Sequence, residues 1–191
     1  MSLPDGWRAA LDVLASAAQP FENDCFRSVE LAYGHPDDVV SGEGTRLHGG
    51  RFVPQGMRAV HASLDEETGT REVSARKARL GGRAQIRLKD YPRLTYVISV
   101  KVEECVDFRP VDRSTALGET LATALDLSDL TDSQVVGQYL VGKGVQAAVV
   151  PSIVGPGANI VVFIDARPRP RIEIRNREEI LEAIQRLARR T

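Results

Sequence analysis

The residue types best suited to chemistry gather between Ser41 and Glu72 of this 191-residue chain. Four glycines within nine residues form a loop there: Gly42, Gly44, Gly49 and Gly50. Glycine tolerates positive φ, so such a loop can bring its backbone close to a ligand. Arg51 follows the loop directly, and His61 comes next along the chain. A cation, an imidazole and a carboxylate beside a flexible loop indicate an anion-binding catalytic cleft. The alternative is a surface loop with an incidental pairing of Arg51 and Glu72.

A second arginine, Arg27, occupies a segment whose alternating pattern predicts a strand. Arg27 shares one face of that strand with Cys25, Val29 and Leu31. An arginine among apolar neighbours is costly to bury unless an anion accompanies it. Arg27 therefore either pairs with a carboxylate for structural reasons or lines a pocket for an anionic ligand.

The helices and strands that must position these residues alternate irregularly along the chain. Apolar residues at helical spacing predict helices over about 5–18, 65–80, 118–126, 131–141 and 177–190. β-prone runs predict strands over 25–31, 51–53, 58–63, 94–102, 145–150, 158–165 and 171–174. This order predicts an α+β fold in a single domain, residues 1–191, with a core over 24–165. The first and last helices are expected to pack on that core.

Polar residues on the predicted helices also have structural explanations. Glu72 lies one turn before Arg76 on the helix over 65–80. The two side chains can form an ordinary i,i+4 ion pair, which is the alternative to a catalytic role for Glu72. Candidate capping residues are Ser63 or Asp65 for the helix over 65–80, Thr131 with Gln134 for that over 131–141, and Asn176 with Glu179 for that over 177–190.

Composition excludes several classes of function. The net charge is −1 and aromatic residues make up 5% of the chain, so a nucleic-acid-binding surface is not expected. Cys25 and Cys105 are expected to be free, buried thiols, and no metal-ligand spacing of Cys or His occurs. The glycine-rich segments match neither the Walker nor the Rossmann fingerprint. Without a long apolar run or a signal-peptide pattern, we expect a cytoplasmic protein that does not contact a membrane.

Several short segments together resemble the RES domain family, named for the Arg, Glu and Ser that mark it. Their order and spacing carry the resemblance, which spans roughly residues 26–164. The segments are Phe26-Arg27, Ser41-Gly42-x-Gly44, Gly49-Gly50-Arg51-Phe52-x-Pro54-x-Gly56, Val60-His61-Ala62-Ser63 followed by Glu72, Pro151-Ser152, and Asn159-Ile160-Val161-Val162-Phe163.

The resemblance implies a fold related to ADP-ribosyltransferase toxins, with two small antiparallel sheets around a cleft for NAD⁺. It further implies the toxin component of a bacterial toxin–antitoxin pair. Such a toxin consumes NAD⁺, its substrate, by hydrolysis or phosphorolysis of the nicotinamide–ribose bond, without a metal. Transfer of ADP-ribose to a protein acceptor is the alternative reaction. The usual partner is an antitoxin with a helix-turn-helix DNA-binding domain that also blocks the active site.

The resemblance carries five site residues over to this chain. Arg27 and Arg51 would each make bidentate, charge-assisted bonds to the pyrophosphate of NAD⁺. Glu72 would stabilise the positive charge that gathers on the ribose in the transition state. His61 would lie against the nicotinamide. Ser152 would hydrogen-bond either the nicotinamide or Glu72.

Three positions depart from the usual pattern of the family. Phe52 and Val53 stand where tryptophan and asparagine are usual, and His61 stands where a tyrosine is common. These departures allow a third interpretation: a catalytically weak protein that binds nucleotide or its antitoxin partner.

Overall fold

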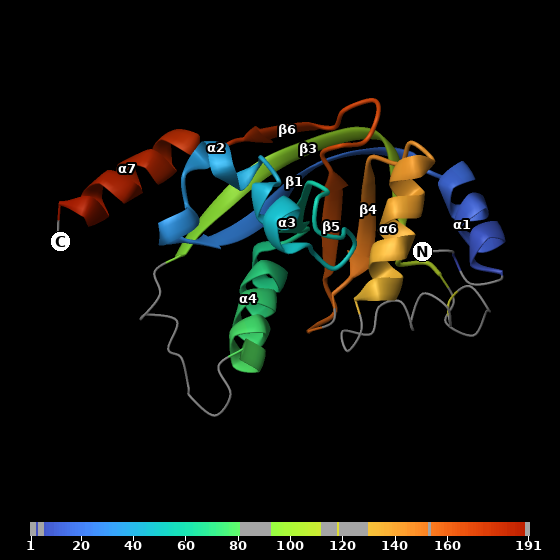
Figure 1. Cartoon of the computed structure of the whole chain (residues 1–191). Helices are drawn as coiled ribbons and strands as arrows, with labels where there is room; N and C mark the ends of the chain where they lie inside the picture. The colour runs from blue at the N-terminus through green and yellow to red at the C-terminus, as the bar shows by residue number, and fades with distance from the viewer. Residues whose placement is uncertain are drawn as a thin grey trace.

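The centre of the molecule is a closed barrel of strands, which the computed structural model shows in Figure 1. The structure describes residues 3, 6–80, 93–111, 118, 130–152 and 154–189. The strands are β1 (Gln19–Glu30), β2 (Ala59–Ser63), β3 (Arg93–Asp107), β4 (Ala147–Pro151), β5 (Ala158–Phe163) and β6 (Arg171–Ile174). They pair in the order β1-β2-β5-β4-β3, a β1–β3 pairing closes the barrel, and β6 adds to β3. All these pairs are antiparallel except β3 with β4.

The predicted α+β class is confirmed, but the expectation of two small antiparallel sheets is wrong. The reason is the length of β3, which has 15 residues. It pairs with β1 from Arg93 to Cys105, and with β4 over Cys105–Asp107. Partway along β1, Phe26 meets Ser63 of β2. Two long strands therefore join what would otherwise be separate sheets.

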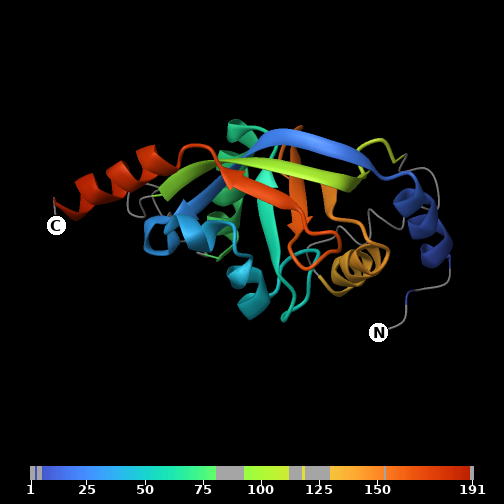
Figure 2. The ribbon, with the colours of Figure 1, turned by 90° about the horizontal axis from the view of Figure 1, so that it is seen from above.

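Helices flank the barrel at both ends. They are α1 (Trp7–Ser16), η1 (Leu31–Tyr33), α2 (Pro36–Val39), α3 (Glu43–His48), α4 (Glu66–Leu80), α6 (Thr131–Gly142) and α7 (Arg177–Ala188). α1 and α6 lie at one end, and α7 extends from the other toward the C-terminus (Figures 1 and 2). α4 leads away from the strands near the middle of the molecule (Figure 1).

Alternation along the strands supplies two hydrophobic cores. Successive side chains point to opposite faces of a strand. Ile160 therefore lies in the interior core, to which all five barrel strands contribute, whereas Val161 lies in the outer core with residues of α1 and α6. Cys25 and Cys105 belong to the interior core and are free and buried, as predicted. Burial raises the pKa of both thiols to about 12, so both are protonated at neutral pH.

The glycine-rich segment is more ordered than the sequence predicts. α3 occupies it, between Gly42 at φ 75° and Gly49 at φ 70°, a backbone conformation that favours glycine. The strand predicted over 51–53 is wrong, because these residues form bends with Phe52 and Val53 buried in the outer core. The helix predicted over 118–126 lies outside the described residues except at Gly118.

Two of the predicted helix caps are replaced by tertiary contacts. α6 has Leu130 at its N-cap, without a side-chain capping bond, and Gln134 bonds elsewhere. Asn176 does occupy the N-cap of α7, but its amide bonds to the backbone of β3 at Val97 and Thr95. Side chains that cap an isolated helix are equally able to bond to a neighbouring element.

Candidate active site

The first turn of α4 determines where Glu72 lies. Asp65 caps this helix, because its carboxylate accepts hydrogen bonds from the Thr68 amide and the Thr68 hydroxyl, each at 2.7 Å. These bonds hold the pKa of Asp65 below its usual value. Thr68 packs so closely on Gly157 that a Cβ there has no room. Glu72 follows Thr68 by four residues and therefore lies on the same face of the helix.

Glu72 is held through one of its two carboxylate oxygens. Its Oε1 accepts hydrogen bonds from Ser152 Oγ at 2.7 Å and from Asn159 Nδ2 at 2.6 Å. Among the described residues, Oε2 has no hydrogen-bond partner, and the side chain is partly exposed. The structure thus joins Glu72 to Ser152, two residues that the sequence placed in one site. The side chain of Arg76, the alternative partner, lies outside the described part of the chain.

Asn159 is a site residue that the sequence interpretation missed. It lies on β5 directly opposite Ser63 of β2. Ser63 Oγ donates a hydrogen bond of 2.7 Å to Asn159 Oδ1. Two signals were available: Asn159 is the one polar residue near the start of an apolar strand, and it begins one of the segments that resemble the RES family. Neither signal names its partner.

Arg27 of β1 reaches β2 at His61, close to Ser63. Arg27 Nη1 donates a hydrogen bond of 2.5 Å to the carbonyl oxygen of His61. One partner of this arginine is therefore a backbone carbonyl, whereas the sequence suggested a carboxylate or an anionic ligand. His61 and Ser63 are alternate residues of β2, so their side chains share a face about 7 Å apart along the strand. β2 consequently links the Glu72 cluster to the arginine.

The backbone around Arg51 is held by α6. Ser133 Oγ donates a hydrogen bond to the carbonyl of Arg51, and Gln134 Nε2 donates one of 2.9 Å to the carbonyl of Gly50. A Cβ on Gly50 would lie 2.8 Å from His61 Cε1, so the imidazole lies against the backbone of this loop. The sequence interpretation used Gln134 as a helix cap and did not consider Ser133.

Phe52 and Val53, two of the departures from the family pattern, are core residues. Their exposed fractions are 1% and 0%. Gly137 of α6 packs against the carbonyl of Phe52 without room for a Cβ. The guanidinium carbon of Arg51 lies 5.4 Å from the centre of the Phe52 ring, within cation–π range. Substitutions at 52 and 53 therefore change the packing that supports the loop.

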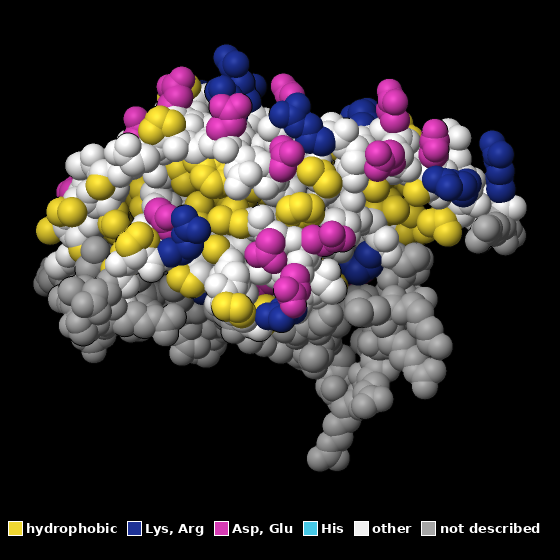
Figure 3. All heavy atoms as spheres, turned by 180° about the vertical axis from the view of Figure 1, so that it is seen from behind, with side chains coloured by type: hydrophobic (Ala, Val, Ile, Leu, Met, Phe, Trp, Pro, Cys, Tyr) yellow, Lys and Arg dark blue, Asp and Glu magenta, His cyan; other side chains and the backbone are white. Residues whose placement is uncertain are grey.

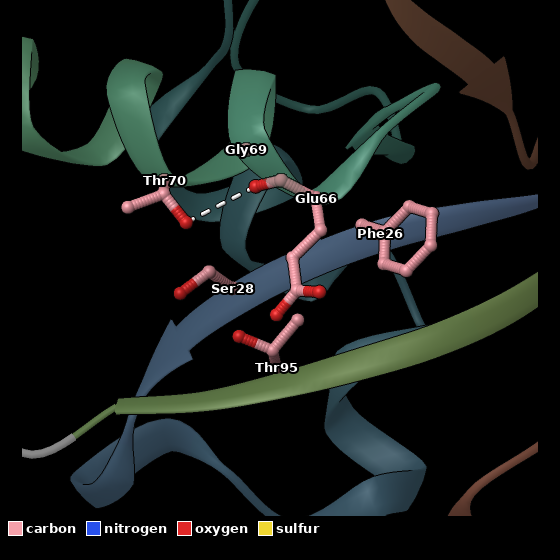
Figure 4. A pocket seen from close by; sticks show the side chains of 6 residues that line it. All are labelled: Phe26, Ser28, Glu66, Gly69, Thr70 and Thr95. Carbon is pink, nitrogen blue, oxygen red and sulfur yellow. Dashed lines mark hydrogen bonds between the residues drawn. The ribbon is translucent and has the colours of Figure 1, made fainter.

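A surface depression of the described chain lies between β1 and α4 (Figure 4). It is too shallow to enclose a water molecule. Phe26 and Ser28 line it, and strand alternation points them away from the face that carries Arg27. This depression is therefore separate from the anion site that the sequence predicts. Its other lining residues are Glu66, Gly69, Thr70 and Thr95.

Charges are mixed on the described surface. Figure 3 shows acidic and basic side chains interspersed over the back of the molecule. Among the described residues, no three His, Cys, Asp or Glu side chains lie together as metal ligands. No described helix is long and apolar enough to cross a membrane.

Comparison with known proteins identifies the family of this chain. Residues 25–182 match the RES domain. The chain belongs to the RES domain family. Its fold is also that of a chain in the crystal structure of the M. tuberculosis MbcT–MbcA toxin–antitoxin complex, with a TM-score of 0.69 and 21% identity over 96% of this chain and 100% of that one. Among curated proteins, no sequence matches this RES domain chain.

Proposed function

We propose that this RES domain protein is an NAD⁺ glycohydrolase or phosphorylase and the toxin of a toxin–antitoxin pair. The Glu72 carboxylate carries the proposal. Ser152 and Asn159 hold it through Oε1. Oε2 has no hydrogen-bond partner among the described residues, so it can face a substrate. A fixed, partly exposed negative charge suits a reaction that develops positive charge.

Cleavage of NAD⁺ breaks the bond between C1′ of the ribose and the nicotinamide nitrogen. The electron pair leaves with nicotinamide, which departs as a neutral molecule and needs little acid catalysis. The ribose gains oxocarbenium character, which the carboxylate of Glu72 stabilises. Water or phosphate then bonds to C1′. In hydrolysis, the proton of the attacking water passes to Glu72 or to solvent.

The two arginines and His61 bind the substrate in this proposal. Planar guanidinium groups make bidentate bonds to phosphate oxygens, so Arg27 and Arg51 suit the pyrophosphate. The bond from Arg27 to the His61 carbonyl holds that arginine beside β2. His61 lies against the nicotinamide from its position on the Gly50 backbone.

We propose an antitoxin protein with a helix-turn-helix domain as the partner. The similar fold in the MbcT–MbcA complex, which is a toxin–antitoxin complex by its title, supports the proposal. The helix-turn-helix domain of this partner is inferred from the resemblance to RES toxins, whose usual antitoxins contain one. An antitoxin that covers the Glu72 carboxylate would block access of NAD⁺.

The deciding experiment follows nicotinamide release from NAD⁺ by the purified protein, with and without phosphate. We expect free nicotinamide, with ADP-ribose as the second product in water and its phosphate ester when phosphate attacks. NAD⁺ labelled in the adenine is expected to leave the protein unlabelled. Labelled protein would indicate ADP-ribosyl transfer instead. A protein that releases no nicotinamide but binds NAD⁺ would be the catalytically weak alternative.

A further inference from the structure

We infer that Ser63 and Asn159 are positioning residues that orient the Glu72 carboxylate, an inference that rests on the proposed function. Ser63 donates to Asn159 Oδ1 at 2.7 Å, and Asn159 Nδ2 donates to Glu72 Oε1 at 2.6 Å. The three side chains form a directed series of hydrogen bonds from β2 through β5 to α4.

The direction of the series depends on the asymmetry of a carboxamide. Asn159 has one oxygen that accepts and one nitrogen that donates. The carboxylate of Glu72 only accepts, so it binds the nitrogen, and the hydroxyl of Ser63 donates to the oxygen. A rotated amide would set its oxygen against Glu72 Oε1, and two acceptors would then oppose each other. The carboxylate therefore selects the amide orientation, and Ser63 holds the amide in it by donating to its oxygen.

Packing keeps Ser63 in this role. Its side chain is only 5% exposed, and it lies directly across from Asn159 in the barrel. A Cβ on Gly69 would lie 3.5 Å from Ser63 Oγ, so α4 passes close over this serine. Gly69 precedes Glu72 by three residues and shares its helix face. The same serine thus borders the helix and anchors the amide that binds the carboxylate of Glu72.

Ser152 and Asn159 contribute differently to Glu72. The hydroxyl of Ser152 also accepts a hydrogen bond of 3.2 Å from the Val154 amide, and it follows the end of β4. A hydroxyl rotates about its bond, whereas the Asn159 amide is fixed at both ends. Loss of Ser63 is therefore expected to disturb the orientation of Glu72 while Arg27 and Arg51 still bind NAD⁺.

A double-mutant cycle in the full-length protein tests the kinetic consequence. Ser63→Ala and Asn159→Ala are each expected to lower kcat for nicotinamide release about tenfold, the size expected for one lost hydrogen bond, with KM changed less than twofold. The double variant should be no slower than Asn159→Ala, because Ser63 acts through Asn159. Ser28→Ala, a strand serine with its own hydrogen bond from Arg93, is the control. Multiplied effects in the double variant would overturn the inference.

A second measurement does not depend on turnover. The side-chain amide signals of Asn159 in an NMR spectrum of the ligand-free protein are identified by their loss in Asn159→Ala. We expect slow hydrogen exchange at this amide in the parent and much faster exchange in Ser63→Ala, with the backbone spectrum preserved. Unchanged exchange contradicts the positioning role even in an active enzyme. A parent that releases no nicotinamide contradicts the proposed function, and the amide exchange then still decides this inference.

Discussion

The two halves of the candidate site are held in place by opposite means. Around Glu72, side chains bond to the functional side chain itself, through Ser152 and Asn159. Around Arg51, side chains of α6 bond to the backbone, through the carbonyls of Arg51 and Gly50. In the Glu72 half the charged side chain itself is held. In the Arg51 half the bonds hold the backbone that carries the charged side chain.

This difference fits the tasks proposed for the two residues. A carboxylate that opposes a developing charge gains most from being oriented before the reaction. An arginine that binds a pyrophosphate has a long side chain, which reaches a ligand once its backbone is in place. Variants should therefore change turnover in the Glu72 half, and stability or substrate affinity in the Arg51 half.

Glu72→Gln should have the largest effect. The substitution keeps the shape of the side chain and removes its charge, so it tests electrostatics. We expect nicotinamide release to fall about 10²–10³-fold, the usual cost of losing preorganised charge stabilisation. The thermal midpoint should remain close to that of the parent.

The matched control is Glu67→Gln on the same helix, where an exposed carboxylate pairs with Arg71 at 2.5 Å. It should retain parental turnover, because an exposed pair of this kind contributes at most about 0.5 kcal/mol of stability. Near-parental cleavage by Glu72→Gln would refute the catalytic role and remove the contrast between the halves.

Gly137→Ala should be the most disruptive change in the Arg51 half. Its Cβ would collide with the carbonyl of Phe52, which is backbone and cannot move aside cheaply. We expect the free energy of unfolding, measured with urea, to fall by about 1–3 kcal/mol. Gly142→Ala, on the same helix with no atom within 4 Å of the new Cβ, is the control. Equal stability of the two variants would show that α6 does not press on this loop.

Gln134→Ala removes one hydrogen bond between α6 and the loop and should have a smaller effect. The carbonyl of Gly50 loses its 2.9 Å hydrogen bond, at a cost of about 1 kcal/mol. Because the loop carries Arg51, we expect KM for NAD⁺ to rise a few-fold while kcat changes little. Gln138→Ala, an exposed glutamine of the same helix, should behave as the parent. A fall in kcat at constant KM would contradict the division between the halves.

Asp165→Asn should have the smallest effect and a defined pH dependence. Burial acts to raise the pKa of Asp165, but hydrogen bonds from the amide and guanidinium of Arg58 outweigh it and keep the pKa below its usual value. The resulting stability is present above the unfolded pKa of about 3.9 and is lost as the pH falls through the folded pKa.

Both side chains of the Arg58–Asp165 pair are about a third exposed, 36% and 34%, so solvent screening limits the contribution to about 1 kcal/mol. The free energies of unfolding of parent and variant, measured with urea, should differ by that amount at pH 7 and become equal in acid. An undiminished difference in acid would assign the effect to packing between the ends of β2 and β5.

The sequence by itself determined the local features of this protein. Nearest neighbours in the chain are enough to predict the glycines around Arg51, a helix that carries Glu72 and strands with alternating burial. They also narrow the cap of that helix to Ser63 or Asp65, and the structure shows Asp65. Such features depend on backbone preferences and on periodicity, which a few consecutive residues express. The motif order also indicated the RES family, which the match over residues 25–182 confirms.

Tertiary structure alone decided how these pieces meet. The bonds from Ser152 and Asn159 to Glu72 span 80 and 87 positions, and that from Ser63 to Asn159 spans 96. Closure of the barrel, in place of two sheets, depends on the register between β1 and β3. Which distant side chains become partners is set by strand pairing and helix packing, and no local pattern records it. For that reason Glu72 and Ser152 could be named as site residues from the motif order, whereas the roles of Asn159 and Ser63 could not.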